Sequence, residues 1–137
     1  MDAAAALADL TEISSQVEAA AVLDADGALL ASTHGDEPRA ARLAETAREL
    51  LAAAAEAPAA TGRELTQLEV ALRGGSVFVV RHGGRVVVAT TAPDPPSGLV
   101  LYDLRACLRA LDEAPKPKPR ARRRTPAKQP AGGDDAA

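Results

Sequence analysis

The chain has 137 residues, enough for one domain with a modest core, and its single cysteine, Cys107, excludes an internal disulfide. No apolar run reaches the ~18 residues of a membrane-spanning helix, so we expect a soluble cytoplasmic protein without a transmembrane segment. Charge is divided unevenly: residues 1–114 hold 17 acidic and 9 basic residues, whereas residues 115–137 hold 2 acidic and 7 basic residues.

The first part of the chain predicts a short helix followed by a β-hairpin. Large apolar residues recur at helical spacing at Leu7, Leu10, Ile13 and Val17. Residues 19–23 and 28–33 are predicted strands around the turn Asp24-Ala25-Asp26-Gly27, where the glycine suits a left-handed backbone.

An alanine-rich helix is predicted next, from a cap at Asp36 to Ala57, with Pro58 ending it. Its apolar residues form two adjacent stripes that together span roughly 140°, more than contact with one sheet requires. The stripes are Leu43, Ala47, Leu50 and Ala54, and Ala40, Ala44, Leu51 and Ala55. Two interpretations remain equally open: a close helix–helix interface, or an alanine-rich composition that merely fills the helix.

Three strands should follow this helix. Residues 64–73 alternate, with Leu68, Val70 and Leu72 on one side and polar or small residues on the other. The unbroken apolar runs 77–80 and 86–89 flank the turn His82-Gly83-Gly84, which predicts a hairpin buried on both faces.

The last predicted helix runs from a cap at Ser97 to Leu111, after the Pro-rich break at residues 93–96. Residues 115–137 contain no Val, Ile, Leu or aromatic side chain. Such a segment cannot offset the ~1 to 2 kcal/mol that ordering each backbone residue costs. We therefore predict a domain over residues 1–114 and a disordered basic tail over residues 115–137.

Motifs that carry chemistry are absent. Asp24-x-Asp26-Gly27 is similar to part of a calcium loop, but Val22 and Thr33 stand where ligands are needed. Neither histidine has a second ligand at metal-binding spacing, and Cys107 lies on an apolar helix face without a nearby base. The sequence predicts a binding module without enzyme activity, metal or cofactor.

The order of elements resembles the roadblock family of dynein-light-chain-type domains, in a bacterial form. The segments AAAVLDADGALLAST (residues 19–33) and SGLVLYDLRACLRAL (residues 97–111) carry most of the likeness, which covers residues 7–111. The resemblance implies an α/β fold of the α+β type, in the order α-β-β-α-β-β-β-α. A five-stranded antiparallel sheet would have the long helix on one face and two shorter helices on the other.

The resemblance also implies partners. Family members pair through the long helix and the edge strand that follows it, and bacterial dimers bind small Ras-like GTPases. The corresponding elements here are residues 36–57 and 64–73, and the implied interface residues are Ala40, Ala44, Leu51, Ala55, Gln67, Leu68, Glu69, Val70 and Ala71. We expect a noncatalytic homodimer that regulates or scaffolds a small Ras-like GTPase in signalling or polarity.

The basic tail supports an alternative function. Its cationic side chains, spaced by prolines that keep the segment extended, could contact nucleic acid or an anionic membrane surface. They are Lys116, Lys118, Arg120, Arg122, Arg123, Arg124 and Lys128. The alternative is a dimeric DNA-associated accessory protein, although no aromatic residue lies among them to stack on bases. A solvated tail that touches the acidic domain only loosely is a third possibility.

Overall fold

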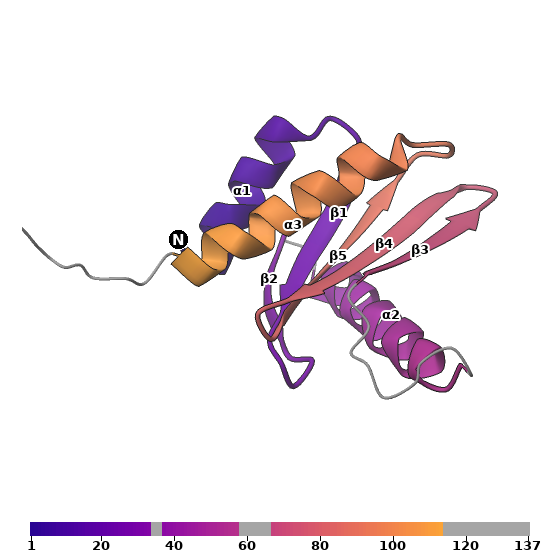
Figure 1. Ribbon diagram of the computed structural model, residues 1–137, viewed down its shortest axis with the longest axis horizontal. Coiled ribbons are helices and arrows are strands. Elements are labelled where there is room, and N and C mark those ends of the chain that lie inside the picture. The colour runs from indigo at the N-terminus through magenta and orange to yellow at the C-terminus, as the bar shows by residue number, and fades with distance from the viewer. Residues whose placement is uncertain (34–36, 58–66, 114–137) are drawn as a thin grey trace, which may run out of the picture.

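A computed structural model describes residues 1–33, 37–57 and 67–113, in which three helices flank one antiparallel sheet (Figure 1). The elements are α1 (Ala3–Ile13), β1 (Val17–Leu23), β2 (Leu29–Ser32), α2 (Glu37–Ala55), β3 (Gln67–Leu72), β4 (Gly75–His82), β5 (Arg85–Thr91) and α3 (Ser97–Glu113). The strands lie in the order β2-β1-β5-β4-β3, with α1 and α3 on one face and α2 on the other. The predicted element order and α+β class are confirmed.

The sheet separates two hydrophobic clusters, because successive strand residues point to opposite faces. Phe78, Val80 and Val87 belong to the cluster under α1 and α3, which also contains Leu104 and Leu108 of α3. The alternate strand residues form the other cluster, with Ala44 and Ala47 of α2; they include Ala21, Leu23, Val79, Val86 and Val88. The predicted hairpin buried on both faces is confirmed, since all of these side chains are buried.

Glycine turns set the register of the two hairpins. Gly83 and Gly84 both have a positive φ, 62° and 79°, the combination that a two-residue turn needs to match the strand twist. In the β1–β2 turn, Gly27 has a φ of 86°, and the Asp24 carboxylate accepts hydrogen bonds from the backbone N–H groups of Asp26 and Ala28. These are the turns that the sequence predicted.

The end of α1 and the cap of α3 differ from the prediction. Helix α1 begins at Ala3 because Asp2 is its N-cap and accepts a hydrogen bond from the Ala5 N–H at 2.8 Å, whereas Val17 opens β1 instead of closing the helix. Ser97 does not cap α3. Its hydroxyl donates to Glu69 Oε2 of β3 at 2.6 Å, and the Pro96 carbonyl accepts the first backbone hydrogen bonds of the helix.

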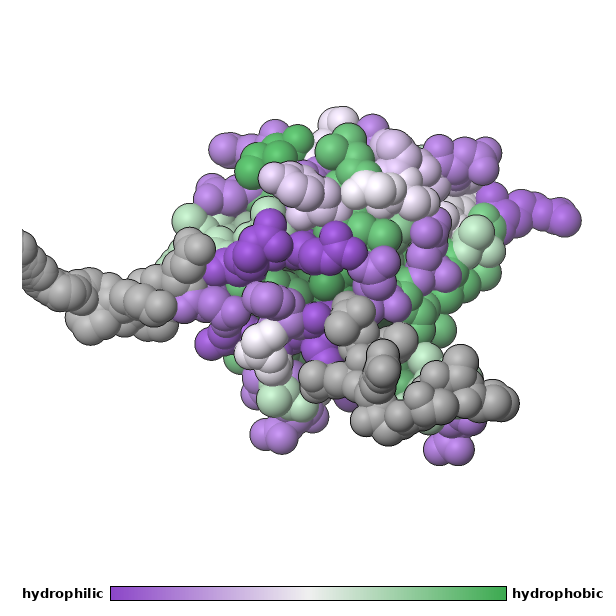
Figure 2. Space-filling model, in the orientation of Figure 1, coloured by the Kyte–Doolittle hydropathy of each residue, from purple (hydrophilic) through white to green (hydrophobic). Residues whose placement is uncertain are grey.

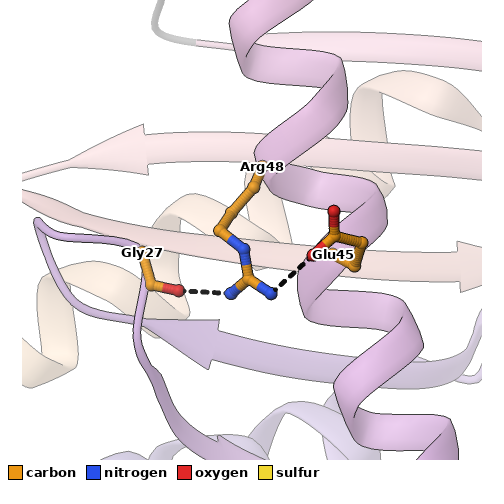
Figure 3. Close-up of polar contacts among 3 residues, drawn as sticks. All are labelled: Gly27, Glu45 and Arg48. Carbon is orange, nitrogen blue, oxygen red and sulfur yellow. Dashed lines mark hydrogen bonds and ion pairs between the residues drawn. The ribbon is translucent and has the colours of Figure 1, made fainter.

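Arg48 joins α2 to the β1–β2 turn (Figure 3). One guanidinium nitrogen donates to the Gly27 carbonyl at 2.6 Å, and another donates to Glu45 Oε1 at 3.0 Å. The side-chain hydrogen bond from Arg48 is the main cause that lowers the pKa of Glu45. Because Gly27 has no side chain, the Arg48 stem can lie against its backbone.

Cys107 is part of the core between α1 and α3. It is 5% exposed, and its thiol donates to the Ala6 carbonyl at 3.7 Å. Burial, with a smaller contribution from the charge of Asp9, raises the pKa of Cys107 to about 11. A thiol with so little thiolate at neutral pH behaves as a small hydrophobic residue.

We predict that Gly75→Ala destabilises the domain by about 2 kcal/mol or more, visible as a lower melting temperature. Gly75 has a φ of 154°, and a Cβ there would lie 2.2 Å from the Thr91 backbone carbonyl oxygen. The neighbouring Gly74→Ala is the matched control, because a Cβ at Gly74 meets no atom within 4 Å. Equal melting temperatures for the two variants would contradict this packing of β4 on β5.

A second prediction concerns Cys107. At pH 8 a thiol of pKa about 11 should be alkylated by iodoacetamide roughly 100-fold more slowly than an unperturbed thiol, and the rate should rise with pH up to that pKa. Unfolding the chain in urea should restore the ordinary rate. Fast alkylation of the folded chain at pH 8 would show that Cys107 is not in this core environment.

Candidate interaction surface

The α2 face of the sheet is covered unevenly. Helix α2 packs mainly on β1, β2 and β5. A helix about 10 Å across spans only about two strands spaced ~4.8 Å apart, so one helix cannot cover a sheet of this width. Two helices, α1 and α3, cover the other face of the sheet together. On the α2 side, β3 and the beginning of β4 are therefore only partly covered, whereas Val79 of β4 is fully buried.

Apolar side chains line this open part. Leu68 and Val70 of β3 and Val77 of β4 are only half-buried, and Leu72 is 59% exposed. We call the sheet residues Leu68, Val70, Leu72 and Val77, together with Leu43 and Leu50 of α2, the β3 face. Figure 2 shows hydrophobic surface, in green, on the right of the view, where β3 and β4 lie above α2. Contiguous exposed apolar surface of this kind marks interaction sites.

The helical side of the β3 face differs from the stripe that the resemblance implied. Ala40 and Ala44 are 4% and 1% exposed, buried within the protomer, and Leu51 is half-buried beside the same sheet. Ala55 is exposed. In the neighbouring stripe, Leu43 and Leu50 are half-buried, whereas Ala47 is fully buried.

The five β3 residues of the predicted interface, residues 67–71, do lie together on the edge strand of the sheet. Leu68 and Val70 point toward the α2 side, whereas Gln67, Glu69 and Ala71 alternate to the α3 side. Glu69 accepts the Ser97 hydroxyl hydrogen bond, and Gln67 accepts one from Arg105. Two polar contacts therefore hold β3 to α3, while residues 64–66 of the predicted strand lie outside the described residues.

The backbone of β3 has a defined outer edge. Leu72 pairs with Gly75 across a two-residue turn, and such a turn closes with a hydrogen-bonded pair. Hydrogen-bonded and non-hydrogen-bonded pairs alternate along an antiparallel ladder. The N–H groups of Gln67, Glu69 and Ala71 thus face away from β4, toward the edge where another strand could add.

The other candidate residues make no second site. Within the described parts of the chain, no three His, Cys, Asp or Glu side chains are grouped to hold a metal ion. His82 Nε2 lies 3.3 Å from Asp112 Oδ2 on the surface. The tail residues Lys116, Lys118, Arg120, Arg122, Arg123, Arg124 and Lys128 lie outside the described residues, so their contact with polyanions stays a prediction. No helix in the described segments is long and apolar enough to span a bilayer.

Comparison with solved structures shows the same fold in bacterial proteins. A Roadblock/LC7 domain from Streptomyces avermitilis is 18% identical, with a TM-score of 0.67, and the match covers 77% of this chain and 90% of that one. The gliding protein MglB from Thermus thermophilus is 18% identical, with a TM-score of 0.65 over 80% of this chain and 84% of its own. MglB from Myxococcus xanthus is 16% identical, with a TM-score of 0.60 over 80% and 87% of the two chains.

Sequence comparison agrees with the fold. No curated protein sequence matches the chain. The family model of the Roadblock/LC7 domain matches residues 4–92, from α1 to the end of β5. The likeness seen in residues 97–111 therefore lies outside the matched region, although α3 completes the core. Because the match spans more than half of the chain, the protein belongs to the Roadblock/LC7 domain family.

Proposed function

We propose that this protein is a noncatalytic, homodimeric regulator or scaffold of a small Ras-like GTPase, acting in the cytoplasm in signalling or polarity. The observation that carries the proposal is the β3 face: in a Roadblock/LC7 chain, half-open apolar surface lies directly beside an unpaired strand edge. Both features are unfavourable in a monomer, because exposed strand edges and apolar patches promote association with other chains.

A second copy of the chain suits this surface. If β3 pairs antiparallel with the β3 of its mate, the two sheets become continuous, and each subunit presents the same patch to the other. The arrangement would bring the partner subunit's α2 toward the open part of the sheet, next to Leu43 and Leu50. Pairing would then cover apolar surface and satisfy the outward N–H groups of β3 together.

The GTPase part of the proposal rests on the family. The fold is shared with MglB proteins, one of them described as a gliding protein, and the resemblance to bacterial roadblock domains implies binding of small Ras-like GTPases by dimers. A dimer offers a composite surface that neither subunit has alone, and a partner that uses it loses contact area when the dimer separates.

Charge separation supports one second candidate. Residues 1–114 carry a net −8 and residues 115–137 a net +5, so the tail could bind DNA while the folded part only dimerises. Binding through the tail would weaken steeply with salt, because it depends on releasing counterions from phosphates. Binding of a protein to the folded part would depend on dimerisation and much less on salt.

We predict that the full chain is a dimer at tens of micromolar by sedimentation equilibrium and that Glu69→Pro is monomeric. Proline at this position removes a donor that faces the free edge and leaves the β4 ladder intact. Glu69→Ala is the matched control: it loses the same hydrogen bond to Ser97 but keeps the backbone N–H, and should remain dimeric. Circular dichroism must show both variants folded. A parent that sediments as a monomer would refute the dimer.

The GTPase prediction uses the same variants. The small Ras-like GTPases of the source organism, purified and loaded with a non-hydrolysable GTP analogue or with GDP, would be titrated against the full chain by calorimetry. We expect the parent and Glu69→Ala to bind one of them and folded, monomeric Glu69→Pro to bind at least 10-fold more weakly, since half of a composite surface is lost. Binding to duplex DNA with none to any GTPase would favour the DNA-associated alternative.

A further inference from the structure

The hydrogen-bonding pattern of the sheet restricts how a second copy of the chain can add to β3. The glycine turn between β4 and β5 closes with a hydrogen-bonded pair, His82 with Arg85. Bonded and non-bonded pairs alternate from there, so Val77 of β4 exchanges its hydrogen bonds with Val70 of β3. This pattern agrees with the one counted from the β3–β4 turn. The outward N–H groups of β3 are those of Gln67, Glu69 and Ala71.

Symmetry restricts the pairing further. Outward-facing residues must lie opposite outward-facing residues, since only these have N–H and C=O groups to exchange. In a two-fold symmetric pair that meets this condition, one residue lies opposite its own copy. An axis at Glu69 or Val70 pairs five of the six residues of β3 with the partner strand, whereas an axis one residue farther toward either end pairs three. Two registers therefore remain.

The side chains on the α2 side distinguish these two registers. An axis at Glu69 sets two carboxylates directly opposite each other, which is destabilising, and leaves the exposed Leu72 outside the paired residues. An axis at Val70 sets Val70 opposite its own copy and Leu72 opposite the partner subunit's Leu68. These are non-hydrogen-bonded pairs, in which opposed side chains come closest. Every large apolar side chain of β3 then meets another one.

The α3 side of the strand favours the same register. With the axis at Val70, Gln67 lies opposite the partner subunit's Arg73, and Glu69 lies on the diagonal to the same arginine, within reach of long side chains. Glu69 Oε2 accepts the Ser97 hydroxyl, and a carboxylate can accept further donors at its second oxygen. Arg73 is exposed in the turn that ends β3. Opposite charges thus meet on this face while apolar residues meet on the other.

We propose that β3 recognises a second copy of this chain in a single antiparallel register, with the two-fold axis between the two Val70 residues. The inference rests on the homodimer of the proposed function and adds which residues meet. A slip by one residue would turn the apolar side chains to the wrong face, and a slip by two would oppose the Glu69 carboxylates or shorten the ladder. The edge strand therefore carries its own specificity for an identical strand.

The test is disulfide cross-linking of the full chain. In a non-hydrogen-bonded pair the Cα atoms are ~4.5 Å apart, a distance that a disulfide can bridge. Val70→Cys should therefore form a covalent dimer under mild oxidation, seen on a non-reducing gel. Glu69→Cys is the matched control, because its two copies lie on a diagonal of at least ~7 Å and should cross-link roughly 10-fold more slowly or not at all. Cys107 is buried and should not react in the parent chain.

A mixing experiment checks the register at a second position and does not depend on the folding of Val70→Cys. Leu68→Cys and Leu72→Cys chains should each give little covalent dimer alone. When the two are mixed, exchanged and oxidised, the new thiols lie opposite each other and should cross-link. Sedimentation equilibrium of every reduced variant must accompany the gels, because it reports the dimer independently of its register.

The charged contact has its own readout. Arg73→Glu should raise the dissociation constant of the dimer roughly 3-fold or more, because it sets like charges near each other, and high salt should reduce the difference. Arg109→Glu, at an exposed position of α3, is the control and should leave the dissociation constant unchanged. Equal effects of the two variants would contradict the meeting of Arg73 with Glu69.

The outcomes separate the register from the dimer itself. Faster cross-linking of Glu69→Cys than of Val70→Cys would overturn the register and place the axis at Glu69, while the dimer would stand. A dimer by sedimentation in which none of the variants cross-links would also overturn the proposal, since β3 would not pair with its copy. A parent chain that is a monomer would overturn the homodimer of the proposed function together with this register.

Discussion

The structure depends on the burial of β5 on both faces. Residues 86–89 are apolar and nearly inaccessible, and β5 lies between β1 and β4 at the centre of the sheet. A strand of this kind is stable only when each face of its sheet is covered by another layer. The chain supplies α1 and α3 for one face and α2 for the other. The whole three-layer arrangement follows from this requirement.

The helices cover the two faces of the sheet unequally, and the candidate interface lies where the cover on the α2 side is incomplete. Alanines at Ala44 and Ala47 let α2 approach β1 and β5 closely, and Arg48 strengthens that placement through the Gly27 carbonyl. Farther along the sheet, the apolar side chains of β3 and of Val77 in β4 are at most half-buried. Hydrogen bonds from α3 hold β3 from the opposite face, so the edge strand can present its outer N–H groups without losing its own register. Tight packing of α2 on β1 and β5 thus leaves apolar side chains of β3 accessible.

Sequence patterns alone predict the order of elements, the burial of residues 78–80 and 86–89 on both faces of the sheet, and the turns at Gly27, Gly83 and Gly84. Each of these leaves a local pattern: a period of two or 3.6, an unbroken apolar run, or a residue that tolerates a positive φ. The boundaries of α1 and the cap of α3 were not determined locally, because a polar residue can serve as a cap or bind elsewhere. Asp2 caps its helix, whereas Ser97 binds Glu69.

Which residues of α2 are buried depends on contacts that are distant in sequence. Both stripes of that helix are apolar, so the burial of Ala40 and Ala44 from one stripe and of Ala47 from the other follows from where the helix lies on the strands. In the sequence, Asp103 is one charge among many on a helix, and it is buried where α1 packs against α3. Local patterns fix what each segment becomes, whereas contacts between segments distant in sequence fix which groups are left exposed or unpaired.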